Sequence, residues 1–183
     1  MNKKTTLTIL ALSLAIFVIA GVAYAVSYLN ITLSPAGSSG WISSTSTNVA
    51  FVGFYFDNTP TSTEDLILDK LAVTNYGTSS TTSRVFSMLY LYDNSPSSTL
   101  IATTTHRVGE NTFVFKDFAF TIPSSTVKSL LIKGDLGTAA TPGQTIRLGV
   151  DNANAVKAHG AITGAPTTVT GNFPIMGNDF FVY

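Results

Sequence analysis

The chain has no cysteine among its 183 residues and only two histidines, His106 and His159. The absence of cysteine excludes disulfide bonds, catalysis by a thiolate and metal sites built on cysteine. A domain that works outside the cytoplasm without disulfides must be held by its hydrophobic core, by bound ions or by other chains. The sequence therefore has to be judged first on its apolar pattern.

Charge is the second scarce property. Charged residues make up 11% of the chain, whereas about a quarter is usual. Ten basic residues balance ten acidic ones, so there is no basic footprint for nucleic acid and no acidic tail. Serine and threonine supply about a quarter of all residues instead. Such a neutral, hydroxyl-rich surface suits a protein that lies against other copies of itself or against a cell wall.

The N-terminal segment has the pattern of an export signal. Lys3 and Lys4 precede an apolar run from Leu7 to Val22, which ends in the small-x-small sequence Ala23-Tyr24-Ala25. This arrangement is typical of a secretory signal peptide, and an uncleaved segment would be a helical membrane anchor with its lysines in the cytoplasm. In both cases we expect the rest of the chain to be secreted or displayed at the cell surface.

The remaining sequence predicts an all-β domain. Residues 49–57 are apolar on both faces, as in a central strand, and residues 66–75 alternate between apolar and polar, which is typical of a half-buried strand. No stretch beyond residue 25 has a helical period long enough for a confident helix. Many short strands separated by turn signals favour an antiparallel, immunoglobulin-like β-sandwich. The other predicted strands are 26–33, 87–92, 100–105, 111–115, 118–122, 127–134, 145–150, 167–170 and 179–183.

These patterns divide the chain into three parts. Residues 1–25 are the signal peptide or anchor, residues 26–47 an N-terminal strand with a flexible linker, and residues 48–183 the β-sandwich domain. The linker assignment rests on the Pro, Gly, Ser and Thr residues around Trp41. The predicted core consists of Phe54, Phe56, Leu68, Leu71, Val73, Leu89, Leu91, Phe113, Phe115, Leu131, Ile146, Leu148 and Val169.

A series of segments between residues 48 and 183 resembles a known family. They are DKLAVTNYG at 69–77, LYLYD at 89–93, TIPSS at 121–125, SLLIKGD at 129–135, TIRLG at 145–149 and VTGNFPIMGN at 169–178. In this order they are similar to an immunoglobulin-like β-sandwich module of secreted surface proteins of prokaryotes, notably candidate-phylum bacteria. The resemblance implies a structural role at the cell surface, and it carries no catalytic residues.

Two terminal strands are candidates for assembly. The strand 26–33, with Tyr28, Leu29, Ile31 and Leu33, either folds back into its own sandwich or is laid into a neighbouring subunit. In the second case main-chain hydrogen bonds would provide the affinity, as in donor-strand complementation. The other candidate is the C-terminal edge formed by Phe180, Phe181, Val182 and Tyr183, which is prone to aggregate unless it is paired.

Other candidate sites have simpler explanations beside them. Calcium could bind near Asp57, Glu64, Asp65 and Asp69, or at Asp151 and Asn154, but Asp and Asn also form turns. A sugar-stacking platform could be built from Trp41, Tyr55, Tyr90 and Tyr92, although such aromatic residues also serve in packing. His106 and His159 both fall in sequence typical of solvated loops. No G-x-S-x-G motif is present to support a serine hydrolase.

The sequence thus predicts a non-enzymatic extracellular structural protein without a cofactor. We expect a surface-layer or pilus-like filament subunit that assembles by strand exchange, with copies of itself or other surface proteins as partners. The alternative is a binding module for a glycan or another surface protein, displayed from the membrane by its N-terminal helix. Nucleic acid is not an expected partner.

Overall fold

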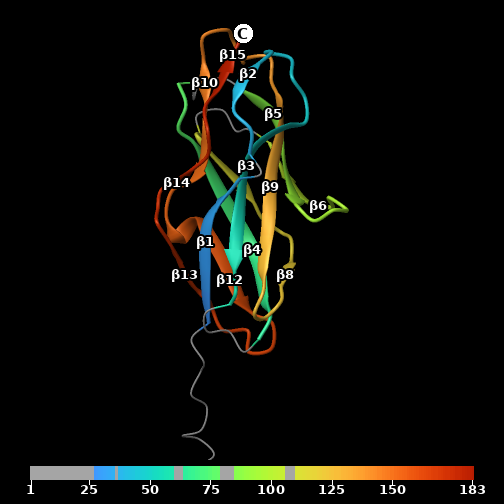
Figure 1. Ribbon diagram of the computed structural model, residues 1–183, viewed down its shortest axis with the longest axis vertical. Coiled ribbons are helices and arrows are strands. Elements are labelled where there is room, and N and C mark those ends of the chain that lie inside the picture. Colours follow the sequence, from blue (N-terminus) through green and yellow to red (C-terminus); the bar gives the residue numbers. More distant parts are fainter. Residues whose placement is uncertain (1–26, 36, 60–63, 79–84, 106–109) are drawn as a thin grey trace, which may run out of the picture.

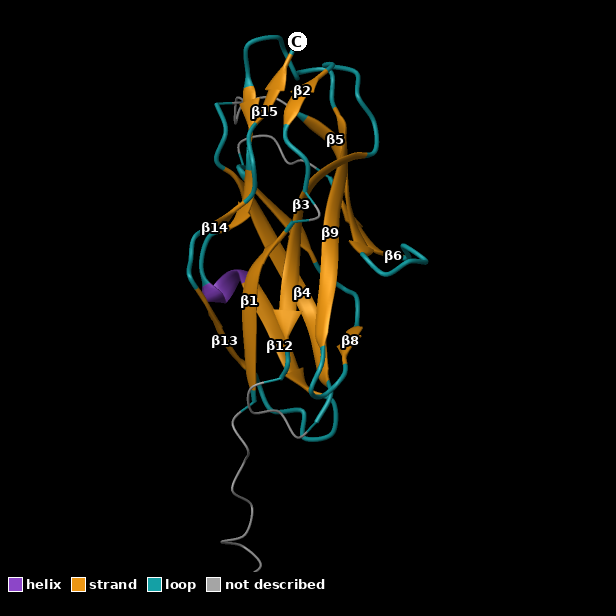
Figure 2. Ribbon diagram, viewed as in Figure 1, coloured by secondary structure: helices purple, strands orange, loops and turns teal. Residues whose placement is uncertain are grey.

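The computed structural model describes residues 27–35, 37–59, 64–78, 85–105 and 110–183, which form a long β-sandwich with a small third sheet at one end (Figures 1 and 2). The predicted signal or anchor segment, residues 1–25, lies outside this described part. Within it, no helix has the length and apolar character needed to cross a bilayer. The all-β sandwich expected from the sequence is confirmed.

The first sheet has six strands, and its second strand is the N-terminal one. All neighbours are antiparallel except β1 and β13, which run parallel, so the sheet is mixed rather than purely antiparallel. The strands in spatial order are β13 (Thr168–Gly171), β1 (Tyr28–Ser34), β3 (Val49–Asp57), β9 (Val127–Leu136), β5 (Phe86–Asp93) and β6 (Leu100–Thr104).

The second sheet is organised around one long strand, β4 (Leu66–Asn75). A register shift in its pairing with β12 skips Asp69, so that Leu66 and Leu68 are buried before it and Leu71 and Val73 after it. Such a bulge changes the face to which later side chains point. The alternation expected over residues 66–75 is therefore interrupted at Asp69, and Ile67 does not share a face with Leu71. The strands beside β4 are β12 (Val156–Gly160), β11 (Leu148–Val150), β7 (Thr112–Phe115) and β8 (Phe120–Ile122), and β14 (Ile175–Met176) follows β11. Between β11 and β12 lies one 3-10 turn, η1 (Ala153–Ala155).

The third sheet covers one end of the sandwich, at the top of Figure 1. Its central strand is β15 (Phe180–Val182), which pairs antiparallel with β10 (Thr145–Ile146) and parallel with β2 (Gly40–Ile42). The region around Trp41, predicted to be a loop, is thus partly a strand. Its register partners on β15 are 140 residues away in the chain, which local composition does not reveal.

Phenylalanine side chains join the sheets at the centre of the core. Phe86 of β5 is fully buried and makes edge-to-face contacts with Phe51 of β3, at 5.3 Å between ring centroids, and with Phe113 of β7, at 5.2 Å. Because Phe113 belongs to the second sheet, these contacts connect the two layers. Of the predicted core residues, all but Val169 are buried, and Val169 packs partly buried against the same core.

We expect Phe86→Ala to lower the free energy of unfolding by about 3–5 kcal/mol, because it removes a large buried ring and leaves a cavity between the sheets. Urea denaturation of the full chain measures the loss as a lower midpoint with an unchanged slope. Ser87→Ala is the matched control, because Ser87 follows Phe86 on β5 and its own side chain is exposed. An equally small change in both variants would show that the ring is not central to the core.

Candidate functional site

Strand β15 fixes the direction of the last aromatic side chains. Phe180 and Val182 are 2% and 1% exposed, and the Phe180 ring packs against Phe51 at 4.9 Å between centroids. Since successive side chains of a strand point to opposite faces, Phe181 and Tyr183 are directed outward. The C-terminal segment is paired on both sides by β10 and β2, so it is not an edge strand.

On the outer face of this small sheet, three aromatic side chains form what we call the distal aromatic patch. It consists of Trp41, which is 71% exposed, Phe181, which is 40% exposed, and Tyr183, which is 62% exposed. Trp41 and Phe181 are register partners on β2 and β15, and their ring centroids lie 5.3 Å apart with 36° between the planes. Large apolar groups gathered at the surface mark sites of interaction.

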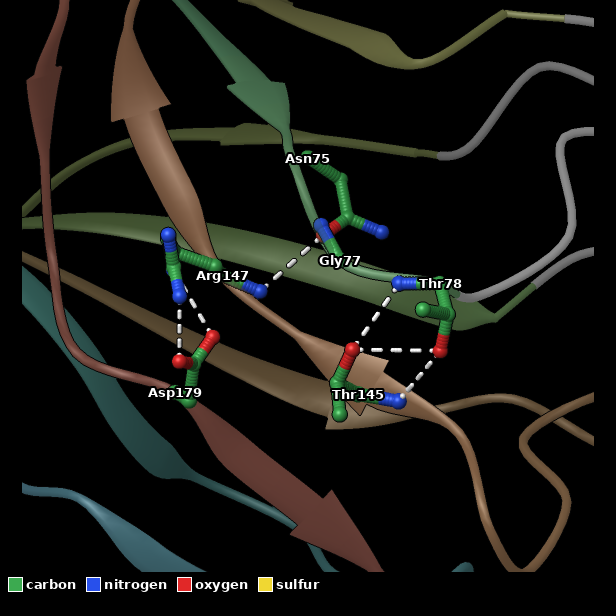
Figure 3. A network of polar contacts seen from close by, with 6 residues as sticks. All are labelled: Asn75, Gly77, Thr78, Thr145, Arg147 and Asp179. Atoms are coloured by element: carbon green, nitrogen blue, oxygen red, sulfur yellow. Dashed lines mark hydrogen bonds and ion pairs between the residues drawn. The ribbon is translucent and has the colours of Figure 1, made fainter.

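A polar network holds the patch strand in place (Figure 3). The Arg147 guanidinium donates from Nε to Asp179 Oδ1 at 2.7 Å and also forms an ion pair through its terminal nitrogen. These side-chain hydrogen bonds lower the pKa of the Asp179 carboxyl and raise the pKa of Arg147. Asp179 directly precedes β15, so the pair anchors the start of that strand to the segment between β10 and β11.

The same network ties the end of β4 to β10. The side-chain oxygen of Asn75 accepts from the backbone N–H groups of Gly77, at 3.0 Å, and Arg147, at 3.1 Å. Thr78 and Thr145 each accept, through their hydroxyl oxygens, the other's backbone N–H at 2.9 Å. A side chain at Gly77 would collide with the Thr145 backbone. The support under the patch is therefore closely packed and well bonded.

The structure places the predicted assembly strand inside its own sandwich. Leu29 and Ile31 of β1 are fully buried, whereas Tyr28 and Leu33 are 37% and 44% exposed. The strand lies between β3 and β13 in the first sheet. Within one chain, therefore, β1 supplies part of the core of its own sandwich.

The carboxylates suggested as calcium ligands bind protein donors instead of converging on one point. Glu64 is 7% exposed and accepts from the Thr163 hydroxyl at 2.7 Å and from the backbone N–H groups of Ile162 and Thr163. These bonds, that of the Thr163 hydroxyl first, lower the pKa of Glu64. Asp57 and Asp65 accept backbone N–H groups. In the described part of the chain, no group of three acidic or histidine side chains is placed to hold a metal.

Asp151, the other calcium candidate, accepts from the Tyr76 hydroxyl at 2.9 Å. Burial, together with this hydrogen bond, raises the pKa of Tyr76 to about 12. Asn152 donates to the second oxygen of Asp151 and caps η1 by accepting from the backbone of Asn154. This segment thus has the hydrogen bonding of a turn.

His159 is not in a solvated loop as expected but on β12, where its Nδ1 lies 2.7 Å from Asp69 Oδ2. Both side chains are more than a third exposed, and the other candidate, His106, lies outside the described residues.

The predicted sugar platform is not a single surface. Tyr90 and Tyr92 share the outer face of β5, with ring centroids 6.4 Å apart. The Tyr90 hydroxyl donates to Asp135, and Lys133 lies over the Tyr92 ring. Tyr55 is on β3, two strands away in that sheet. Trp41 belongs to the small sheet, where its partner is Phe181. No sequence pattern indicates this pair, because residues 180–183 are all large and apolar and Trp41 lies in a stretch of loop composition.

No protein-family model matches the chain, and neither does any curated protein sequence. Among solved structures, a type I cohesin of Pseudobacteroides cellulosolvens is 15% identical, with a TM-score of 0.40 over 85% of this chain and 93% of the cohesin. The CssB subunit of an enterotoxigenic Escherichia coli colonization factor, complemented with a donor strand from the CssA subunit, is 11% identical, with a TM-score of 0.39 over 85% of this chain and 97% of that one.

A family 123 glycoside hydrolase of Clostridium perfringens is 10% identical, with a TM-score of 0.37, and the match spans 85% of this chain but 27% of the hydrolase. All three likenesses have TM-scores below 0.5. At such TM-scores they carry no argument about what this chain binds or does.

Acidification tests the anchor of β15. Because the pKa of Asp179 is lowered in the folded protein, its contribution to stability is present above the carboxyl's unfolded pKa and is lost as the pH falls through the folded one. We expect Asp179→Asn to be less stable than the wild type near neutral pH and to lose less stability on acidification. Denaturant midpoints between about pH 7 and pH 3 measure both effects. Asp117→Asn, at an 84%-exposed side chain, is the control, and identical pH profiles for the wild type and Asp179→Asn would contradict the assignment.

Proposed function

We propose that this chain is a non-enzymatic structural protein of the cell exterior, a surface-layer or filament subunit that makes contacts with copies of itself. The observation that supports this most directly is the distal aromatic patch. Its three side chains are exposed on strands whose opposite faces are anchored in the core. Tryptophan and tyrosine on such rigid supports are typical of the central residues of protein–protein interfaces.

The composition supports the same function. A surface with few charges causes little electrostatic repulsion between copies. Its hydroxyl groups can replace hydrogen bonds to water with hydrogen bonds to a partner. Export by the N-terminal segment would bring such a surface into an environment where many copies meet. Assembly then depends on apolar contacts, for which the patch is suited.

We expect Trp41→Ser to weaken self-association about 30-fold, which corresponds to the loss of about 2 kcal/mol at an interface centre. Sedimentation velocity and negative-stain electron microscopy of the full chain measure it. Leu100→Ser is the matched control, because Leu100 is an exposed apolar residue on β6, away from the patch. A wild-type protein that stays monomeric at high concentration would contradict the proposed function.

A displayed binding module is the second candidate, and the exposure of Trp41 favours it. An indole ring beside Phe181, with the Thr145 side chain next in register, could stack on the apolar face of a sugar. This function predicts a monomer that binds glycans and loses binding in Trp41→Ser. A glycan array probed with and without calcium, together with the sedimentation experiment, distinguishes the two functions.

Strand exchange is a second route to the same assembly. Residues 35–39 connect β1 to β2, and five extended residues let β1 reach about 17 Å from β2, where a swapped strand would make the same contacts at low cost. Asn30 and Thr170 report on it, because they are register partners on β1 and β13 with side-chain oxygens 3.4 Å apart.

Since the chain is free of cysteine, the double variant Asn30→Cys, Thr170→Cys can form only the introduced disulfide. If β1 stays in its own sheet, oxidised assemblies dissolve in detergent to monomers with an internal disulfide. A non-reducing gel measures this, with each single variant as a control. A ladder of linked chains would instead demonstrate exchange of β1 between neighbours.

A further inference from the structure

One apolar side chain is displayed at the end of the molecule opposite to the distal aromatic patch. Ile162 is 86% exposed, the highest value for a large hydrophobic side chain in the described part of the protein. It lies in the loop between β12 and β13, at the bottom of Figure 1, whereas β2 and β15 are at the top. A single exposed isoleucine on a loose loop would not indicate an interaction site. The hydrogen bonds that hold the loop therefore decide whether Ile162 can act as a contact residue.

The loop that carries Ile162 is closed by its own hydrogen bonds. Gly160 N–H donates to the Ala165 carbonyl and Gly164 N–H donates to the Gly160 carbonyl, both at 2.9 Å. Gly164 has a φ of +66°, a conformation in which glycine avoids the strain of a side chain. The turn therefore has a defined shape.

The Glu64 side chain fixes the same loop through hydrogen bonds. Its buried carboxylate accepts the N–H groups of Ile162 and Thr163 and the Thr163 hydroxyl. Ala161 N–H donates to the Asp65 carbonyl at 2.8 Å. The backbone of the loop is thus fixed while the Ile162 side chain points into solvent, which is the arrangement of a preorganised contact residue.

The surfaces at the two ends both display apolar side chains on segments without charged residues. Residues 160–167 contain no charged side chain, and neither do residues 41–48 or 137–145 around the patch. Contact between these segments would bury no charged side chain belonging to either, and the desolvation of charge is a usual cost of polar interfaces. One end presents a single branched aliphatic side chain, and the other presents a cluster of three rings.

We propose that copies of this chain associate head to tail, with Ile162 of one copy seated on the distal aromatic patch of the next. The inference rests on the proposed function and specifies its contact. Because the two surfaces are different and lie at opposite ends of the long axis, the contact is heterologous and leaves a free end on every oligomer. Repetition of it gives a linear filament rather than a closed dimer.

Two single variants test the contact when they are mixed. Ile162→Asp and Trp41→Asp each remove one of the two surfaces, so each protein alone should lose its dimers and larger species. An equal mixture retains one intact junction, between Ile162 of the Trp41→Asp copy and the patch of the Ile162→Asp copy. We expect the mixture to form heterodimers and nothing longer in sedimentation velocity of the full chain.

Leu100→Asp is the control for an added surface charge and should assemble like the wild type, and equal thermal midpoints show that all variants fold. The milder Ile162→Ala should weaken association by about tenfold. A mixture that stays monomeric overturns the inference. An Ile162→Asp protein that still assembles like the wild type also overturns it, but that result leaves the proposed function standing. Absence of any wild-type assembly contradicts both.

Discussion

A row of four phenylalanine rings is the interaction on which the rest of the structure depends. Phe113 of the second sheet contacts Phe86 of the first, Phe86 contacts Phe51, and Phe51 contacts Phe180 of the small sheet. All three sheets are therefore joined through edge-to-face contacts, which add to the free energy of burying the rings themselves. Since Phe180 is fixed inward by this row, its neighbours Phe181 and Tyr183 must face solvent. The exposed aromatic surface of the small sheet is thus a direct consequence of the core.

A chain without cysteine and with few charged residues closes its ends by other means. At one end, Asn75 and the pair of Thr78 and Thr145 join β4 to β10. At the other, buried Glu64 fastens the β12–β13 loop, and Asn58 donates to the carbonyls of Glu64, Ile122 and Pro123. Each of these side chains satisfies backbone groups that a loop would otherwise leave unpaired. Hydroxyl and amide groups therefore take the place that cystines hold in many exported domains.

The long strands were predictable from the sequence, because a continuous apolar run and a period-two pattern are both local properties. Residues 49–57 and 127–134 fall within β3 and β9, and most of the expected core is buried. The bulge at Asp69 and the strand β2 were not predictable, because both arise from partners far along the chain. The patch had the same limitation: Trp41 lies in a stretch with loop composition, and only pairing with β15 brings it to Phe181. The ends of the molecule, where distant segments meet, are the parts that a local pattern describes least well.

The sides of the sandwich differ from its ends in a way that bears on how copies meet. The edge strands of the first sheet, β6 and β13, have five and four residues and are rich in threonine. Short edge strands with polar side chains are poor templates for a further strand. Lateral pairing is therefore weakly favoured, whereas Trp41 and Tyr183 at one end and Ile162 at the other are each more than 60% exposed. With the edges of its first sheet protected and apolar side chains at its ends, the sandwich has an axis along which contact between copies is favoured, and that axis is its longest dimension.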